Sequence, residues 1–139
     1  PGSREWVGPG DPVYDQAVFD AALTLIDALT EHGAVVLWVQ PPLIAKGTVD
    51  GVAPAEPDPV SDPERMEWFR TVGEDLLAVR PDDVRLIDLA GWMRGLDGGE
   101  LDPELRPDGV HFTEEAALFV ADTYLAPRIL EIWDEVDGG

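Results

Sequence analysis

One turn of this chain carries an aspartate and a histidine at a spacing suited to acid–base chemistry. Asp108 and His111 lie in residues 106–113, which read Arg-Pro-Asp-Gly-Val-His-Phe-Thr. A neutral imidazole accepts a proton near pH 7, and a carboxylate beside it fixes its tautomer and stabilises its charged form. We expect His111 to act as a general base toward a serine hydroxyl and Asp108 to orient it.

The spacing alone leaves a second interpretation open. The chain contains 17 aspartates and two histidines, so an Asp-x-x-His match arises easily by chance. In that case Asp108-Gly109 is only a turn, and His111 is a capping or packing residue. The other histidine, His32, precedes Gly33 at an expected helix end, where a structural role is favoured.

Other candidate site residues carry weaker signals. Asp88 lies near the end of a strand, where a bond to a neighbouring backbone group is a better expectation than a role in a site. Trp38, Trp92 and Trp133 are expected in the core, although Trp92 falls on an expected loop and is a weak candidate for lining an acyl or sugar site. No metal site is expected, because cysteine is absent and the two histidines are far apart in the sequence.

Composition restricts the class of protein. A length of 139 residues fits one domain, and 45% hydrophobic residues suffice for a single core. The net charge of −20 repels phosphate backbones, so nucleic acid is not an expected partner. The acidic residues are spread along the chain, as on a solvated surface. No stretch approaches the roughly 20 apolar residues of a membrane helix. The absence of an initiator methionine leaves open a processed product or a piece of a longer chain.

The elements that must position the Asp–His turn alternate between helices and strands. After a connector loop over residues 1–12, with Trp6 as its apolar anchor, a helix is expected from Pro12 to about His32-Gly33, capped by Asp11. Its apolar face should comprise Tyr14, Val18, Ala21, Leu25 and Leu29.

The rest of the chain predicts two strands and two further helices. A continuous apolar strand at 34–39 precedes a long loop over 43–62, and a helix follows from Pro63 to about Val79, capped by Ser61 or Asp62. The second strand is expected at 84–89, a loop at 91–110 and a helix from Thr113, with a kink or restart at Pro127. The inward residues are expected to be Met66, Phe69, Val72, Leu76 and Leu77 in the second helix and Ala116, Val120, Thr123, Tyr124, Ile129, Leu130 and Trp133 in the last.

This alternation predicts an α/β layer architecture with a sheet that is too small. Two strands give three helices little surface to cover, and a strand as apolar as 34–39 needs neighbours on both sides. The sheet should therefore have an open edge, with its missing strands supplied by another segment or chain. Such an edge also gives a reason to expect a dimer.

Three segments carry a family resemblance. They are 34–42 (AVVLWVQPP), 84–92 (VRLIDLAGW) and, above all, 105–113 (LRPDGVHFT). They resemble the carboxyl-terminal part of the SGNH (GDSL-like) hydrolases, a family of flavodoxin-like α/β esterases and acyltransferases. The resemblance implies that Asp108 and His111 are the catalytic aspartate and histidine, that no cofactor is needed, and that residues 13–139 are the carboxyl-terminal part of one three-layer domain lacking its first strands.

Within the family, the chain looks most like SGNH domains fused to membrane acyltransferases that O-acylate cell-surface polysaccharides. That narrower resemblance implies an ester substrate, such as an acylated polysaccharide, and an extracytoplasmic location.

The chain also departs from the family pattern. It lacks the Gly-Asp-Ser nucleophile block, the glycine of the second block and the asparagine of the Gly-x-Asn-Asp block; its only serines are Ser3 and Ser61, and it has no asparagine. We therefore expect no esterase activity from this chain alone. The alternative is a non-catalytic module that binds a glycan or a protein through the sheet edge and the loop at 43–60. A phosphate-binding domain is disfavoured by the acidity and by the lack of a glycine-rich loop.

Overall fold

The computed structural model describes residues 7–49 and 51–138. Ser3 and Trp6 lie outside the described residues, as does half of the expected connector, residues 1–6. The helices are α1 (Pro12–Thr30), α2 (Pro63–Val79), α3 (Leu89–Arg94), α4 (Glu114–Val120) and α5 (Ala126–Asp137), with strands β1 (Val36–Val39) and β2 (Val84–Ile87).

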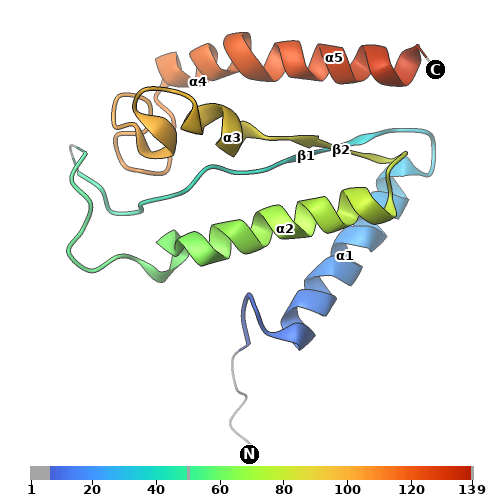
Figure 1. The fold of residues 1–139 in the computed structure, drawn as a ribbon, viewed down its shortest axis with the longest axis horizontal. Coiled ribbons are helices and arrows are strands. Elements are labelled where there is room, and N and C mark those ends of the chain that lie inside the picture. Colours follow the sequence, from blue (N-terminus) through green and yellow to red (C-terminus); the bar gives the residue numbers. More distant parts are fainter. Residues whose placement is uncertain (1–6, 50, 139) are drawn as a thin grey trace, which may run out of the picture.

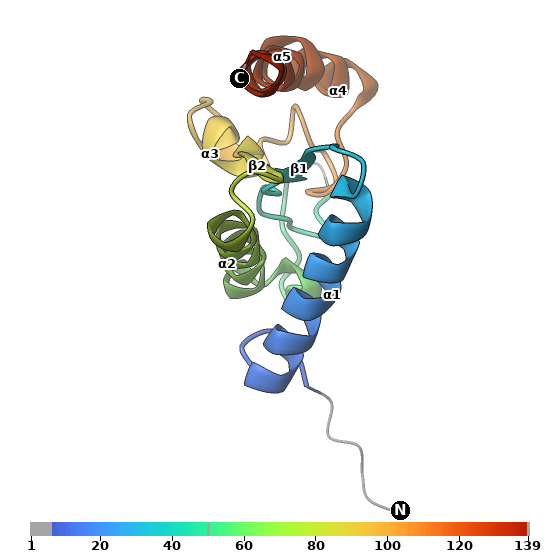
Figure 2. The same ribbon diagram turned by 90° about the vertical axis from the view of Figure 1, so that its right-hand side faces the viewer.

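β1 and β2 form a parallel two-stranded sheet in which Val36 pairs with Val84 and Val39 with Ile87. α1 and α2 lie on one face of this sheet, and α3, α4 and α5 lie on the other (Figures 1 and 2). The predicted α/β layers are therefore present, although both strands are shorter than expected. The second strand stops before Leu89 because Asp88 caps the start of α3 there.

The expected helix caps are confirmed. Asp11 accepts hydrogen bonds from the backbone of Val13 and Tyr14, and Asp62 accepts one from Glu64. Each cap precedes a proline in the first turn, where the missing N–H costs nothing. These local signals explain why both helix starts were predictable from sequence.

The layer formed by α1 and α2 contains one core cluster. Ile26, Val72, Leu76 and Val84 are buried together, with Trp38 packed against them. A Cβ on Gly73 would lie 2.7 Å from the Trp38 ring, so α2 approaches β1 closely only because residue 73 has no side chain.

The buried face of α1 was predicted only in part. Tyr14 and Val18 are half-buried, and the centroid of the Tyr14 ring lies 5.6 Å from that of Trp68 in α2. Ala21, Leu25 and Leu29 are exposed, and Ile26 is the buried residue instead. In α2, Phe69 is also more exposed than expected.

The opposite layer also departs from the prediction. Residues 91–110 are not a continuous loop, because α3 and a 3₁₀ helix (Gly99–Leu101) occupy part of them. Ala116, Val120 and Tyr124 pack inward as expected, but Thr123 is exposed. A π-helical turn (Ala121–Leu125) precedes Pro127 and shifts the helical register. Ile132 is consequently the buried residue of α5, and Ile129, Leu130 and Trp133 are exposed.

One edge of the sheet is open in the described part of the chain. Val36 and Gln40 donate hydrogen bonds to Asp83 and Ile87 on the β2 side. The backbone groups of Leu37 and Val39, which alternate with them, face away from β2. The open edge expected from the strand count is therefore present.

Apolar side chains lie beside this open edge. Val39 is exposed, and Trp133 on α5 is 64% exposed. Leu37, Ile129 and Trp133 line a hollow between β1 and α5. Among the described residues, no helix has both the length and the apolar character needed to cross a bilayer.

Candidate functional site

The Asp108 and His111 side chains contact each other directly. His111 Nδ1 lies 2.7 Å from Asp108 Oδ2. The His111 side chain is 81% exposed, and no hydrogen bond joins its Nε2 to any other described residue. A carboxylate on Nδ1 favours the tautomer that keeps Nε2 unprotonated, so Nε2 is free to accept a proton from a substrate or nucleophile.

Backbone groups hold the Asp108 carboxylate in place. Its Oδ1 accepts hydrogen bonds from the backbone N–H groups of Val110 at 2.9 Å and His111 at 2.7 Å. The His111 side chain and these two N–H groups hold the pKa of Asp108 well below its usual range. Asp108 therefore remains ionised at neutral pH, which is the state required of an orienting carboxylate.

Gly109 lets this turn pack against the segment that follows β1. Its φ of +73° lies in the left-handed region that favours glycine, and a Cβ there would collide with the carbonyl oxygen of Ala45. In return, Ala45 N donates a 2.9 Å hydrogen bond to Gly109 O. The Asp-Gly sequence of the motif thus has a structural requirement as well as a chemical one.

Arg106 anchors the turn from below. It is only 2% exposed, and its Nε and Nη2 donate to Val110 O at 3.0 and 2.9 Å. Its Nη1 donates to the carbonyl oxygens of Leu43 and Glu100. Burial lowers the pKa of Arg106, but a guanidinium stays charged in proteins. The buried guanidinium therefore holds together three segments of the chain, those that contain Leu43, Glu100 and Val110.

Glu100 forms a second buried junction next to Arg106. Its carboxylate lies 2.8 Å from Arg70 Nη2 and 3.3 Å from Arg94 Nη1, and it accepts a 2.6 Å hydrogen bond from Leu43 N. Glu100 and Arg70 are both largely buried. These contacts hold the segment that follows β1 against α2 and α3. The Asp–His turn packs against this same segment.

The described residues do not provide this pair with a serine nucleophile. Ser61 lies just before α2, and its Oγ accepts a hydrogen bond from Lys46 N rather than approaching His111. The arrangement can orient an imidazole and exchange a proton at Nε2, but covalent acyl transfer needs a hydroxyl from elsewhere.

The weaker candidates have structural roles. Asp88 caps α3 by accepting a 2.6 Å hydrogen bond from Gly91 N, as expected for a backbone partner. Trp92 lies in α3 rather than on a loop, and it stacks on Tyr124 with ring centroids 4.9 Å apart. Trp38 is in the core as expected, whereas Trp133 is exposed. His32 is exposed just beyond α1.

Sequence reasoning missed Arg70, Glu100 and Arg106. Charged residues are rarely buried without a partner. Arg70 pairs with exposed Glu67 three positions away, but its buried partner Glu100 is 30 positions away. Leu43, which donates to Glu100, is 57 positions from it. Arg106 did carry a signal, since it opens the 106–113 motif.

Comparisons of this chain with protein-family models, curated proteins and solved structures find no match.

Proposed function

We propose that this chain carries the acid–base half of an SGNH-type serine esterase or O-acyltransferase. His111 is the general base and Asp108 its orienting partner. The serine is supplied by a segment outside the described residues. The observation that carries the proposal is the 2.7 Å contact between His111 Nδ1 and an ionised carboxylate, with Nε2 facing solvent.

In the proposed reaction, Nε2 of His111 takes the proton from the serine hydroxyl as its oxygen attacks the ester carbonyl carbon. The tetrahedral intermediate then collapses, the ester C–O bond breaks, and the alcohol leaves with the proton from the imidazolium. Water or an acceptor hydroxyl removes the acyl group from serine by the same steps in reverse, with His111 again as base. Asp108 stays ionised throughout and stabilises the imidazolium.

The open edge of β1 supports a missing segment of this kind. In open α/β sheets, ligand sites lie beyond the carboxyl ends of the strands. The Asp–His turn packs against Ala45, shortly after the carboxyl end of β1. A parallel strand added beside β1 would end at that same side of the sheet and bring its following residue toward His111.

The proposal makes a direct prediction for this chain on its own. Hydrolysis of p-nitrophenyl acetate by the wild-type chain should exceed that by His111→Ala by no more than a free imidazole contributes, since the described residues place no serine hydroxyl at His111 Nε2. Turnover well above this imidazole rate that drops in His111→Ala would overturn the requirement for an external serine. Reading the coding sequence upstream of Pro1 is the complementary test, because a strand followed by Gly-Asp-Ser, and later a Gly-x-Asn-Asp, is expected there.

The second candidate is a non-catalytic binding module. The exposed apolar side chains beside the edge of β1 favour it, because large exposed apolar patches mark interaction sites. A coding sequence that begins near Pro1 would favour this function over the enzyme.

A further inference from the structure

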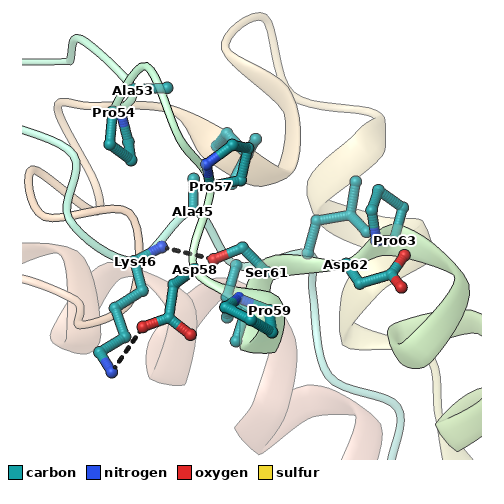
Figure 3. Close-up of a pocket in the computed structure, with 13 residues that line it drawn as sticks. Ala45, Lys46, Ala53, Pro54, Pro57, Asp58, Pro59, Ser61, Asp62 and Pro63 are labelled. Atoms are coloured by element: carbon teal, nitrogen blue, oxygen red, sulfur yellow. Dashed lines mark hydrogen bonds and ion pairs between the residues drawn. The ribbon is translucent and has the colours of Figure 1, made fainter. Parts of the chain in front are cut away.

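The long segment between β1 and α2 lines most of an apolar pocket of about 520 Å³ that is partly open to solvent. Pro54, Pro57 and Pro59 form one side, and Leu43, Ile44 and Leu101 are among the remaining lining residues (Figure 3). This volume lies within the range of about 300–1,000 Å³ typical of small-molecule sites.

The polar side chains of the pocket are paired with one another or with the backbone. Lys46 Nζ lies 2.9 Å from Asp58 Oδ2, and Lys46 N donates a 2.9 Å hydrogen bond to Ser61 Oγ (Figure 3). Asp58 Oδ1 accepts from Val60 N, and Asp62 Oδ1 caps α2. A polar ligand would have to break these contacts, whereas an aliphatic one would not.

The net charge of the protein disfavours anionic ligands. A chain with a net charge of −20 repels a free fatty acid, which is an anion at neutral pH. A neutral aliphatic group, such as the acyl chain of an ester, avoids this repulsion and is stabilised by burying its apolar surface in the pocket.

The pocket and the Asp–His turn share one wall. Ala45 lines the pocket and also donates its backbone N–H to Gly109 O, one residue from Asp108. Leu43 also lines the pocket; its carbonyl oxygen accepts a hydrogen bond from Arg106, and its N–H donates one to Glu100. A ligand in the pocket is therefore separated from the catalytic turn by the width of a single backbone segment.

We propose that this pocket binds the aliphatic acyl chain of the ester substrate, so that the enzyme prefers acyl groups longer than acetyl. The inference rests on the proposed function for its link to catalysis. The binding itself does not depend on a nucleophile, so it is testable with this chain alone.

The test uses the neutral alcohols 1-butanol, 1-hexanol and 1-octanol as probes, with binding followed through the amide NMR shifts of the chain. The affinity for the alcohol should rise about fourfold per added methylene, because each CH₂ group buries additional apolar surface. The largest shifts should fall on residues 43–46, 53 and 101. No dependence on chain length, or shifts centred on Trp133 and α5, would overturn the proposal.

A matched pair of variants locates the site. Ala53 lines the pocket and Ala55 does not, and both are exposed. Ala53→Trp should weaken 1-octanol binding at least tenfold, equivalent to losing about two buried methylenes, whereas Ala55→Trp should leave it unchanged. Equal effects of the two substitutions would contradict the assignment. If Ala53→Trp lowers the melting temperature, Leu101→Gln on another part of the wall serves as the second variant.

His111→Ala separates this inference from the proposed function. It should leave 1-octanol affinity unchanged, because His111 does not line the pocket. Failure of octanol binding rejects the acyl pocket alone. Failure of esterase activity to depend on His111 rejects the proposed function and leaves the octanol result standing.

Discussion

At the scale of single residues, the Asp–His pair is held by more contacts than its short sequence motif suggests. The Asp108 carboxylate contacts the His111 ring nitrogen Nδ1 and accepts hydrogen bonds from two backbone N–H groups. Arg106 donates a further hydrogen bond to the carbonyl oxygen of Val110 in the same turn. The turn is therefore oriented before any substrate arrives, although the imidazole itself is exposed to solvent.

The Asp108 carboxyl group should titrate well below the usual aspartate pKa of about 3.9. Its pKa is lowered first by the hydrogen bond with His111 and then by the backbone N–H groups. Because the folded-state pKa is the lower one, its contribution to stability is present above pH 4 and is lost as the pH falls through the folded value.

Carboxyl ¹³C NMR shifts measured against pH would test this titration. In His111→Ala the Asp108 pKa should rise toward its ordinary range, while the backbone N–H groups keep it somewhat lowered. A wild-type Asp108 that titrates normally would contradict the observed contact.

Replacing Arg106 by lysine should destabilise the fold by about 2–4 kcal/mol, because an ammonium cannot reach all three carbonyl oxygens and leaves buried acceptors unpaired. Urea unfolding measures this loss. Arg128→Lys is the matched control, since Arg128 pairs only with exposed glutamates, and it should change stability by less than about 0.5 kcal/mol. Equal stability of the two variants would show that Arg106 is not a structural anchor.

At the scale of secondary structure, local signals were sufficient for the starts of α1, α2 and α4 and for the strand order, but not for α3. Residue type and position predict caps at Asp11 and Thr113 and at either Ser61 or Asp62. Asp11 and Thr113 make the expected hydrogen bonds, and of the two candidates for α2 it is Asp62 that caps the helix. The parallel strands followed from the alternation of elements.

The buried faces of the helices were harder to predict, because they depend on which other elements each helix packs against in the folded chain. In α1, Tyr14 of the expected face does contact Trp68 of α2, but the residue buried in the core is Ile26, while Leu25 is exposed. In the last helix, a π turn before Pro127 rotates the register, so Ile132 rather than Trp133 is buried. The Asp–His pair was predictable from an eight-residue motif, but the Glu100 and Arg70 contacts join segments distant in sequence.

Gly73→Ala tests how closely α2 packs on β1. Alanine is the better helix former, yet its Cβ would lie 2.7 Å from Trp38. We expect a net destabilisation of about 1–3 kcal/mol from overpacking, measured by urea unfolding. Gly8→Ala is the control, because nothing lies within 4 Å of its Cβ. A more stable Gly73→Ala protein would contradict the close approach.

At the scale of the whole molecule, the sheet edge and the net charge act in opposite directions. The open side of β1 and the exposed Trp133 favour association, while a charge of −20 on each copy opposes it. Raising ionic strength shortens the range of this repulsion to about 3 Å at 1 M salt.

Self-association should therefore increase with salt, as measured by size exclusion with light scattering. Leu37→Lys places a charge at the open edge and should reduce the association, whereas Val79→Lys, at an exposed position at the end of α2, should not. A monomer at all salt concentrations with a cooperative melt would count against a missing strand.

If His111 activates a serine from a segment outside the described residues, the imidazole should control the esterase rate of the full product of the gene. That rate is measured with a p-nitrophenyl ester and compared with the rate of the same protein carrying His111→Ala. We expect the substitution to lower the rate about 10²–10⁴-fold, the usual contribution of a general base, with unchanged folding. An active full-length protein whose rate is the same with and without His111 would show that His111 is not the general base.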